Sequence, residues 1–110
     1  MASSTAQLRK GTIELAVLAL LARKDRYGGE LVELLSSHSG LDASAGTIYP
    51  LLKRLSGSGV VRTSWVESPS GPPRKYYSLT ASGRNELVQL RTAWREVTAS
   101  LNTLLGDDDG

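Results

Sequence analysis

The stretch GTIYPLLKRL, residues 46–55, places apolar side chains at helical spacing around a proline. Its apolar residues follow the i, i+3, i+4, i+7 pattern of one helical face: Ile48, Leu51, Leu52 and Leu55. This pattern predicts a helix over about residues 44–58. Ser44 is a good N-cap, and Gly57 and Gly59 are good signals for the C-terminal end.

The proline raises the question of what the other face of this helix is for. Pro50 lacks the amide that would bond to the carbonyl of Gly46, so it costs one early-turn hydrogen bond and some bending. At about 100° per residue, the side opposite the apolar face carries small, aromatic and basic residues: Gly46, Tyr49, Pro50 and Lys53. We interpret this side as a flat surface that fits the major groove of DNA. An ordinary surface helix that tolerates a proline is the alternative.

In that interpretation the helix N-terminus meets phosphates through Thr47 and backbone amides, while Tyr49 and Lys53 reach base edges. The full set of predicted DNA-binding residues combines this helix with two basic residues further along the chain: Ser44, Gly46, Thr47, Tyr49, Pro50, Lys53, Arg54, Arg74 and Lys75.

The bulk composition indicates a single domain. The chain has 110 residues, of which 40% are hydrophobic, enough for one modest core. It has no cysteine, which excludes disulfides and thiolate metal sites and agrees with a reducing cytoplasm. The longest apolar run, LAVLALLA at residues 15–22, is well short of the ~18 residues that a membrane span needs. We therefore expect a soluble cytoplasmic protein.

The charge is distributed unevenly along the chain. Residues 1–80 hold ten Lys and Arg against six Asp and Glu, whereas residues 81–110 hold three against five. The first part is thus basic by four charges, and the second is acidic by two. A basic surface of this kind can bind a polyanion such as DNA, although an ordinary solvated surface would give the same charge count.

Helical patterns flank the central stretch. Residues 8–23 predict a first helix, which is apolar nearly all round from Ile13 to Ala22 and must be covered on more than one side. A second, short helix carries Leu31, Leu34 and Leu35 on one face and ends near the polar run SSHSG. Thr80 can cap a last helix over 81–105, and an acidic tail follows at 106–110.

A β-hairpin is predicted between the third helix and the last. VVRTSWV at 60–66 and RKYYSL at 74–79 read as strands on either side of the turn-forming ESPSGPP. Arg74 and Lys75 follow the tip directly, which suits contact with phosphates or the minor groove. Trp65, Tyr76 and Tyr77 favour packing over base stacking, because strand alternation turns some of them into the core.

The order helix, helix, helix, hairpin, helix predicts a mostly α fold of the α+β class. It is the order of a winged helix-turn-helix with a long C-terminal helix. We expect a DNA-binding domain over residues 1–80, with its wing at about 60–79, and a dimerisation helix over 81–105 packed on the same domain.

Three segments together closely resemble the PadR family of bacterial transcriptional regulators: SAGTIYPLLKRL (44–55), SGSGVVRTSW (56–65) and SGPPRKYYSLTASG (70–83). The likeness covers about residues 8–105. It implies a homodimeric winged helix-turn-helix repressor, with the third helix as recognition helix and the hairpin as wing. The chain is similar to the short subfamily, which has a single C-terminal helix.

The last helix carries a heptad-like seam that predicts a homodimer interface. The seam follows steps of 3, 4, 3, 4 and 3 residues: Leu87, Leu90, Trp94, Val97, Leu101 and Leu104. Two-fold symmetry would let two recognition helices address half-sites one DNA turn, ~34 Å, apart.

A ligand site at this seam is a further hypothesis. Multidrug-responsive short members of the PadR family look similar here, with a tryptophan that stacks on flat aromatic ligands between subunits. The likeness implies an effector site for a planar aromatic or anionic small molecule at Trp94, Arg91, Leu90, Val97 and Leu18. Trp94 filling the dimer core is the alternative.

The sequence offers almost no material for an enzyme. Its one histidine, His38, has no nucleophile, cysteine or second histidine nearby in the sequence, and we expect no metal site and no cofactor. We therefore expect a sequence-specific regulator of double-stranded operator DNA, a repressor that a ligand relieves, associated with the nucleoid. A winged-helix module that binds a protein partner and has vestigial DNA binding is the alternative function.

Overall fold

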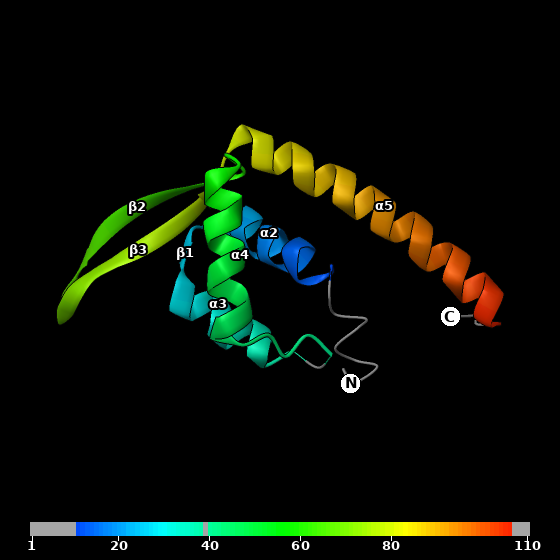
Figure 1. Ribbon diagram of the computed structural model, residues 1–110, viewed down its shortest axis with the longest axis horizontal. Coiled ribbons are helices and arrows are strands. Elements are labelled where there is room, and N and C mark those ends of the chain that lie inside the picture. Colours follow the sequence, from blue (N-terminus) through cyan, green and yellow to red (C-terminus); the bar gives the residue numbers. More distant parts are fainter. Residues whose placement is uncertain (1–10, 39, 107–110) are drawn as a thin grey trace.

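The computed structural model describes residues 11–38 and 40–106 and has a helical body with a projecting hairpin and a long last helix (Figure 1). The hairpin extends to one side of α4 and α5 extends to the other. In chain order the elements are α2 (Ile13–Arg23), β1 (Arg26–Tyr27), α3 (Gly28–Ser36), α4 (Ala45–Gly57), β2 (Val61–Ser68), β3 (Gly71–Leu79) and α5 (Ala81–Leu105).

The core lies between α2, α3 and α4, and the base of the sheet closes it. The largest buried side chains come from these helices and have at most 2% of their surface exposed: Val17, Leu18, Leu21, Leu31, Leu35, Ile48, Leu52 and Leu55. Tyr77 and Leu79 of β3 and Leu87 of α5 belong to the same buried cluster, as do Ile13, Ala43 and Val61. Since a fully buried aliphatic side chain contributes about 1.5–3 kcal/mol, this cluster is the main source of stability.

The sheet is antiparallel with the strand order β1-β3-β2. The two-residue strand β1 pairs Arg26 with Tyr77 and Tyr27 with Tyr76. No strand was predicted at these residues from the sequence. A two-residue strand is too short for any periodicity, so its pairing depends on β3 being placed beside it by the rest of the fold.

The hairpin has longer strands and a tighter turn than predicted. The ladder of β2 and β3 runs from Val61 opposite Leu79 out to Ser68 opposite Gly71. The two prolines at 72–73 lie within β3, where the register shifts next to Glu67. A bulge accommodates prolines there because it removes regular ladder bonds.

The first helix of the described residues begins later than predicted. We expected it from residue 8, but α2 begins at Ile13, after Thr12 at its N-cap and Gly11 at a φ of 92°. Residues 8–10 lie outside the described part of the chain, as does most of the predicted acidic tail, at 107–110. The long C-terminal helix is confirmed, because α5 covers residues 81–105 as predicted.

Thr80 and Gly83 join α5 to the turn between α4 and β2. The Thr80 hydroxyl donates to the Gly59 carbonyl at 2.7 Å and accepts from the Gly83 amide at 3.0 Å. The Thr80 amide donates to the Val60 carbonyl at 3.2 Å. Gly83 lies so close to this carbonyl that a Cβ atom there would overlap the Val60 oxygen. Only glycine lets α5 start at this position.

Replacing Gly83 by alanine should therefore destabilise the protein. Because the obstacle is backbone, the main chain must shift, and we expect a loss of about 2 kcal/mol or more, as for an overpacked core. This corresponds to a fall in Tm of roughly 8 °C or more in a thermal unfolding experiment followed by circular dichroism.

Gly57→Ala is the matched control. An alanine Cβ at this helical position meets nothing within 4 Å, so stability should stay the same or rise by up to ~1 kcal/mol. Equal Tm values for the two alanine variants would contradict the close approach at Gly83.

Candidate nucleic-acid interface

Helix α4 has a buried face and an outward face, as its sequence predicts. Ile48, Leu52 and Leu55 have 0%, 0% and 1% of their surface exposed. Pro50 lies inside a helix that continues without interruption from Ala45 to Gly57. The outward face consists of exposed residues on the other side of the same helix: Gly46, Tyr49, Pro50 and Lys53.

The N-terminus of α4 has no side-chain cap. Ser44 occupies the N-cap position, yet its hydroxyl makes no capping bond. Its carbonyl accepts the first bonds of the helix, from the amides of Thr47 and Ile48, both at 3.0 Å. Gly46 is not required by space, since a Cβ there would come no closer than 3.7 Å to the Ser44 hydroxyl. The exposed Ser44 hydroxyl therefore lies free to contact a ligand at the positive end of the helix.

Two of the predicted DNA-binding residues lie on the flank of α4 that faces α2. Arg54 forms an ion pair with Glu14 of α2, at 2.5 Å between Nη2 and Oε1, although 61% of the Arg54 side chain remains exposed. Thr47 and Arg54 line a surface cavity of about 390 Å³ with Glu14 and Leu51, and Pro50, at the edge of the outward face, reaches the same cavity. Neither residue is part of the outward face, and the charge of Arg54 is partly committed to Glu14.

Tyr49 connects α4 to α3 and to the sheet. Its ring covers Gly28, the first residue of α3, so closely that a Cβ at position 28 would overlap the ring. Burial raises the pKa of Tyr77 on β3, and the neighbouring Tyr49 phenol raises it further. Tyr49 still has 45% of its surface exposed. About half of the Tyr49 surface therefore packs against neighbouring residues, and the other half is exposed and available to a ligand.

Arg74 and Lys75 lie along β3, several residues from the turn, and not at the hairpin tip as predicted. The Arg74 guanidinium carbon lies 4.5 Å from the centroid of the Tyr27 ring, which packs edge-on against Tyr76 at 5.6 Å. The Lys75 ammonium lies 6.0 Å from the Tyr77 ring centroid. Because alternate residues of a strand point to opposite faces, the two cations serve different faces of the wing.

Trp65 is a candidate contact residue that sequence reasoning missed. Packing was predicted for Trp65, Tyr76 and Tyr77; Tyr77 is 7% exposed, but Trp65 is 69% exposed. Trp65 pairs with Lys75 across the ladder, beyond the part of β2 that the helices cover. Trp65 lies on the same face of β2 as the buried Val61, as strand alternation predicts. It is exposed because the hairpin extends beyond the helices, so no core residue covers this position.

The interface is electropositive. Among residues 11–38 and 40–106, no ion pair involves the exposed cations near this surface: Lys53, Arg62, Arg74 and Lys75. In the same described ranges no cluster of His, Asp or Glu side chains could hold a metal ion. Nor does any helix there combine the length and apolar character that a membrane crossing requires.

The seam of α5 is partly used within the chain itself. Leu87 is only 4% exposed and packs in the core, so its predicted place in the dimer interface is wrong. Leu18 is fully buried and cannot line the predicted ligand site. A cavity of about 200 Å³ does form at Trp94, Leu90 and Val97, but Leu15 of α2 lines it in place of Leu18, and Arg91 does not line it. Sequence spacing alone could not tell which face of the apolar α2 meets α5.

The fold and the α4 surface can be compared with known proteins. The model of the Transcriptional regulator PadR-like family matches residues 17–89. The chain belongs to this family. The PadR match extends from the middle of α2 to the first turns of α5, so it includes the outward face of α4 and the whole wing.

Relatives agree in sequence and in structure. Transcriptional regulator Rv3488 of Mycobacterium tuberculosis is 32% identical over 91 residues, covering 83% of this chain and 83% of the relative. A PadR-like transcriptional regulator of Bacillus cereus superposes with a TM-score of 0.82 at 34% identity, covering 90% of this chain and 96% of the other.

One related structure contains nucleic acid. Bacillus subtilis PadR in complex with operator DNA superposes with a TM-score of 0.64 at 28% identity, covering 70% of this chain and 45% of that protein. The comparisons confirm the resemblance to PadR proteins and the predicted α+β winged-helix class. They also confirm the expectation that the chain is no enzyme, since its family consists of transcriptional regulators.

Proposed function

We propose that this PadR-like regulator is a homodimeric repressor that binds double-stranded operator DNA in a sequence-specific manner. The observation that carries the proposal is the outward face of α4: a small, flat surface with Tyr49 and Lys53 exposed beside an electropositive wing. A helix of this size fits the major groove of B-form DNA. The operator complex of Bacillus subtilis PadR supports the assignment.

In this proposal some residues contact phosphates and position the protein on the DNA, and others contact bases and read the sequence. Phosphates meet the positive N-terminus of α4 and the Ser44 hydroxyl. Tyr49 and Lys53 enter the groove, and Gly46 and Pro50 keep the surface low enough for the bases to approach. The tethered Tyr49 enters with its ring already oriented by Gly28, which lowers the entropy lost on binding.

The wing contacts the DNA beside α4. Arg74 and Lys75 provide charge on the two faces of β3, and the exposed Arg62 adds a third cation. Trp65 lies across from Lys75 and provides an exposed apolar surface, and proteins that bind the minor groove use apolar side chains against the bases there. Lysine or arginine contacts made to phosphate strengthen binding without regard to sequence.

The C-terminal half of α5 is the dimer interface in this proposal. Trp94, Val97, Leu101 and Leu104 have 47–81% of their surface exposed in the single chain. A continuous apolar strip of this kind marks an interaction site, and its heptad-like spacing suits a second copy of the same helix. Figure 1 shows this part of α5 projecting beyond the body of the domain.

An effector would act through the same interface. The cavity at Trp94, of about 200 Å³, is bounded by Leu15, Leu90 and Val97 and is open in the single chain. In a dimer two such cavities approach each other, and a planar aromatic molecule can stack on Trp94. A ligand relieves repression only if it binds more tightly to a dimer whose recognition helices have the wrong spacing for the operator.

Fluorescence anisotropy on duplexes tests the DNA-binding proposal. An operator would be taken from the region upstream of the gene, or from a selection among random duplexes, and compared with a scrambled duplex. We expect preference for the operator by ~10³-fold or more with a steep salt dependence. Lys53→Ala should weaken operator binding by ~10-fold or more, the loss expected for a base or phosphate contact.

Arg91→Ala is the control, because it removes the same charge from an exposed position of α5, the helix that extends on the other side of α4 from the hairpin (Figure 1). Its operator affinity should stay within about twofold of wild type, since a remote charge is largely screened. Weak binding without sequence preference, or equal effects of the two variants, would contradict the proposal and favour a module that binds a protein partner.

Light scattering tests the dimer. At micromolar concentration the measured mass should be twice the 11.8 kDa of one chain. Leu101→Lys should shift the mass to that of one chain, because a charge would be buried in the seam. Val88→Lys on the same helix, at an exposed position outside the seam, should leave the dimer intact. A wild-type monomer would refute the seam.

A further inference from the structure

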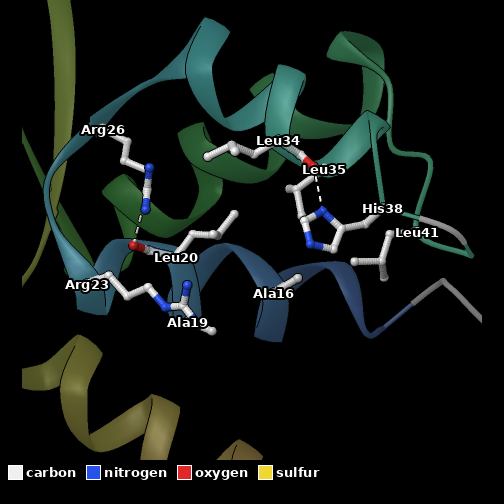
Figure 2. A pocket seen from close by; sticks show the side chains of 9 residues that line it. All are labelled: Ala16, Ala19, Leu20, Arg23, Arg26, Leu34, Leu35, His38 and Leu41. Carbon is white, nitrogen blue, oxygen red and sulfur yellow. Dashed lines mark hydrogen bonds between the residues drawn. The ribbon is translucent and has the colours of Figure 1, made fainter.

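A separate cavity opens between α2 and α3, beside the loop that follows α3 (Figure 2). Its volume is about 280 Å³, and it shares no residue with the cavity at Trp94. Ala16 and Ala19 form its floor on α2, and Leu34 and Leu41 form the opposite wall. The small alanine side chains are what leave room between the two helices.

Two arginines enter the cavity from one end (Figure 2). Arg26 is already committed: its Nε donates to the Leu20 carbonyl at 3.2 Å and its Nη1 to Glu30 at 3.3 Å, and its side chain is only 11% exposed. Arg23, in the last turn of α2, is exposed and has no ion pair or hydrogen bond within the described residues. Arg23 therefore offers an available guanidinium at the end of an apolar cavity.

His38 lines the opposite end. Its Nδ1 lies 2.7 Å from the Leu34 carbonyl oxygen. Because a carbonyl can only accept, Nδ1 must carry the proton, and this bond fixes the ring at the cavity (Figure 2). His38 is also the single histidine of the chain, so its ring protons give isolated NMR signals.

We propose that this cavity binds a small amphipathic monocarboxylate. The carboxylate pairs with the Arg23 guanidinium, and the aliphatic body lies between α2 and α3 and ends near His38. Glu30 is engaged with Arg26 and Lys24, at 3.3 and 3.9 Å, and no acid among the described residues forms an ion pair with Arg23. The volume is near the lower limit for ligand pockets, which excludes nucleotides and folded partners.

The charge pattern favours an anion with a single negative group. One guanidinium is available and the remaining walls are mostly apolar, so a second charge on the ligand would be buried without a partner. The site does not depend on the proposed DNA binding. It does lie against α3, whose first residue, Gly28, contacts Tyr49 of α4.

Proton NMR with sodium octanoate tests the proposal on the full chain. We expect a saturable shift of the His38 ring signals and a nuclear Overhauser effect between the His38 Hε1 and the terminal methyl group of octanoate. Octanamide, which lacks the charge, should bind ~10-fold or more weakly, as should octanoate with the Arg23→Gln variant.

Two controls separate this site from others on the chain. Arg91→Gln removes a charge from α5, and Trp94→Phe alters the other cavity, so both should keep the wild-type affinity for octanoate. No saturable shift up to ~10 mM octanoate, where even a weak site is occupied, would overturn the proposal. Equal affinity of wild type and Arg23→Gln would also overturn it.

Discussion

The rotation of α4 about its own axis is the constraint on which the rest of the structure depends. Ile48, Leu52 and Leu55 are buried to within 1% of their surface, and each contributes about 1.5–3 kcal/mol. Turning the helix by one residue position, about 100°, would expose these side chains and bury Lys53 without a partner. The hydrophobic effect therefore holds the outward face in place, and Pro50 can occupy that face because the buried side chains stabilise the helix.

The wing and the last helix take their positions from the end of α4. Val60 donates its amide to the Leu55 carbonyl at 3.0 Å, and Gly59 adopts a φ of 81°, which directs the chain from α4 into β2. The Thr80 and Gly83 contacts then start α5 from the same turn. The outward face of α4, the wing and α5 thus share one joint, so in the proposed dimer a change in the angle of α5 would alter the spacing of the two α4 helices.

Much of this arrangement could be predicted from the sequence, because it depends on local patterns. The apolar spacing around Pro50 gave the buried and outward faces of α4, and Thr80 gave the start of α5. The failures concern contacts between distant segments. β1 forms only because β3 lies beside it. Leu18 and Leu87 are buried in the core. Arg54 forms an ion pair with Glu14, which is 40 residues away in the chain. No periodicity encodes these contacts.

The central claim is that two copies of α4, held by α5, read one DNA duplex. Hydroxyl-radical footprinting of the purified protein on its selected operator measures this directly. The account predicts two protected segments with centres one helical turn apart, ~34 Å or about 10 base pairs, related by two-fold symmetry. A single protected segment, or protection that appears equally on a scrambled duplex, would contradict it.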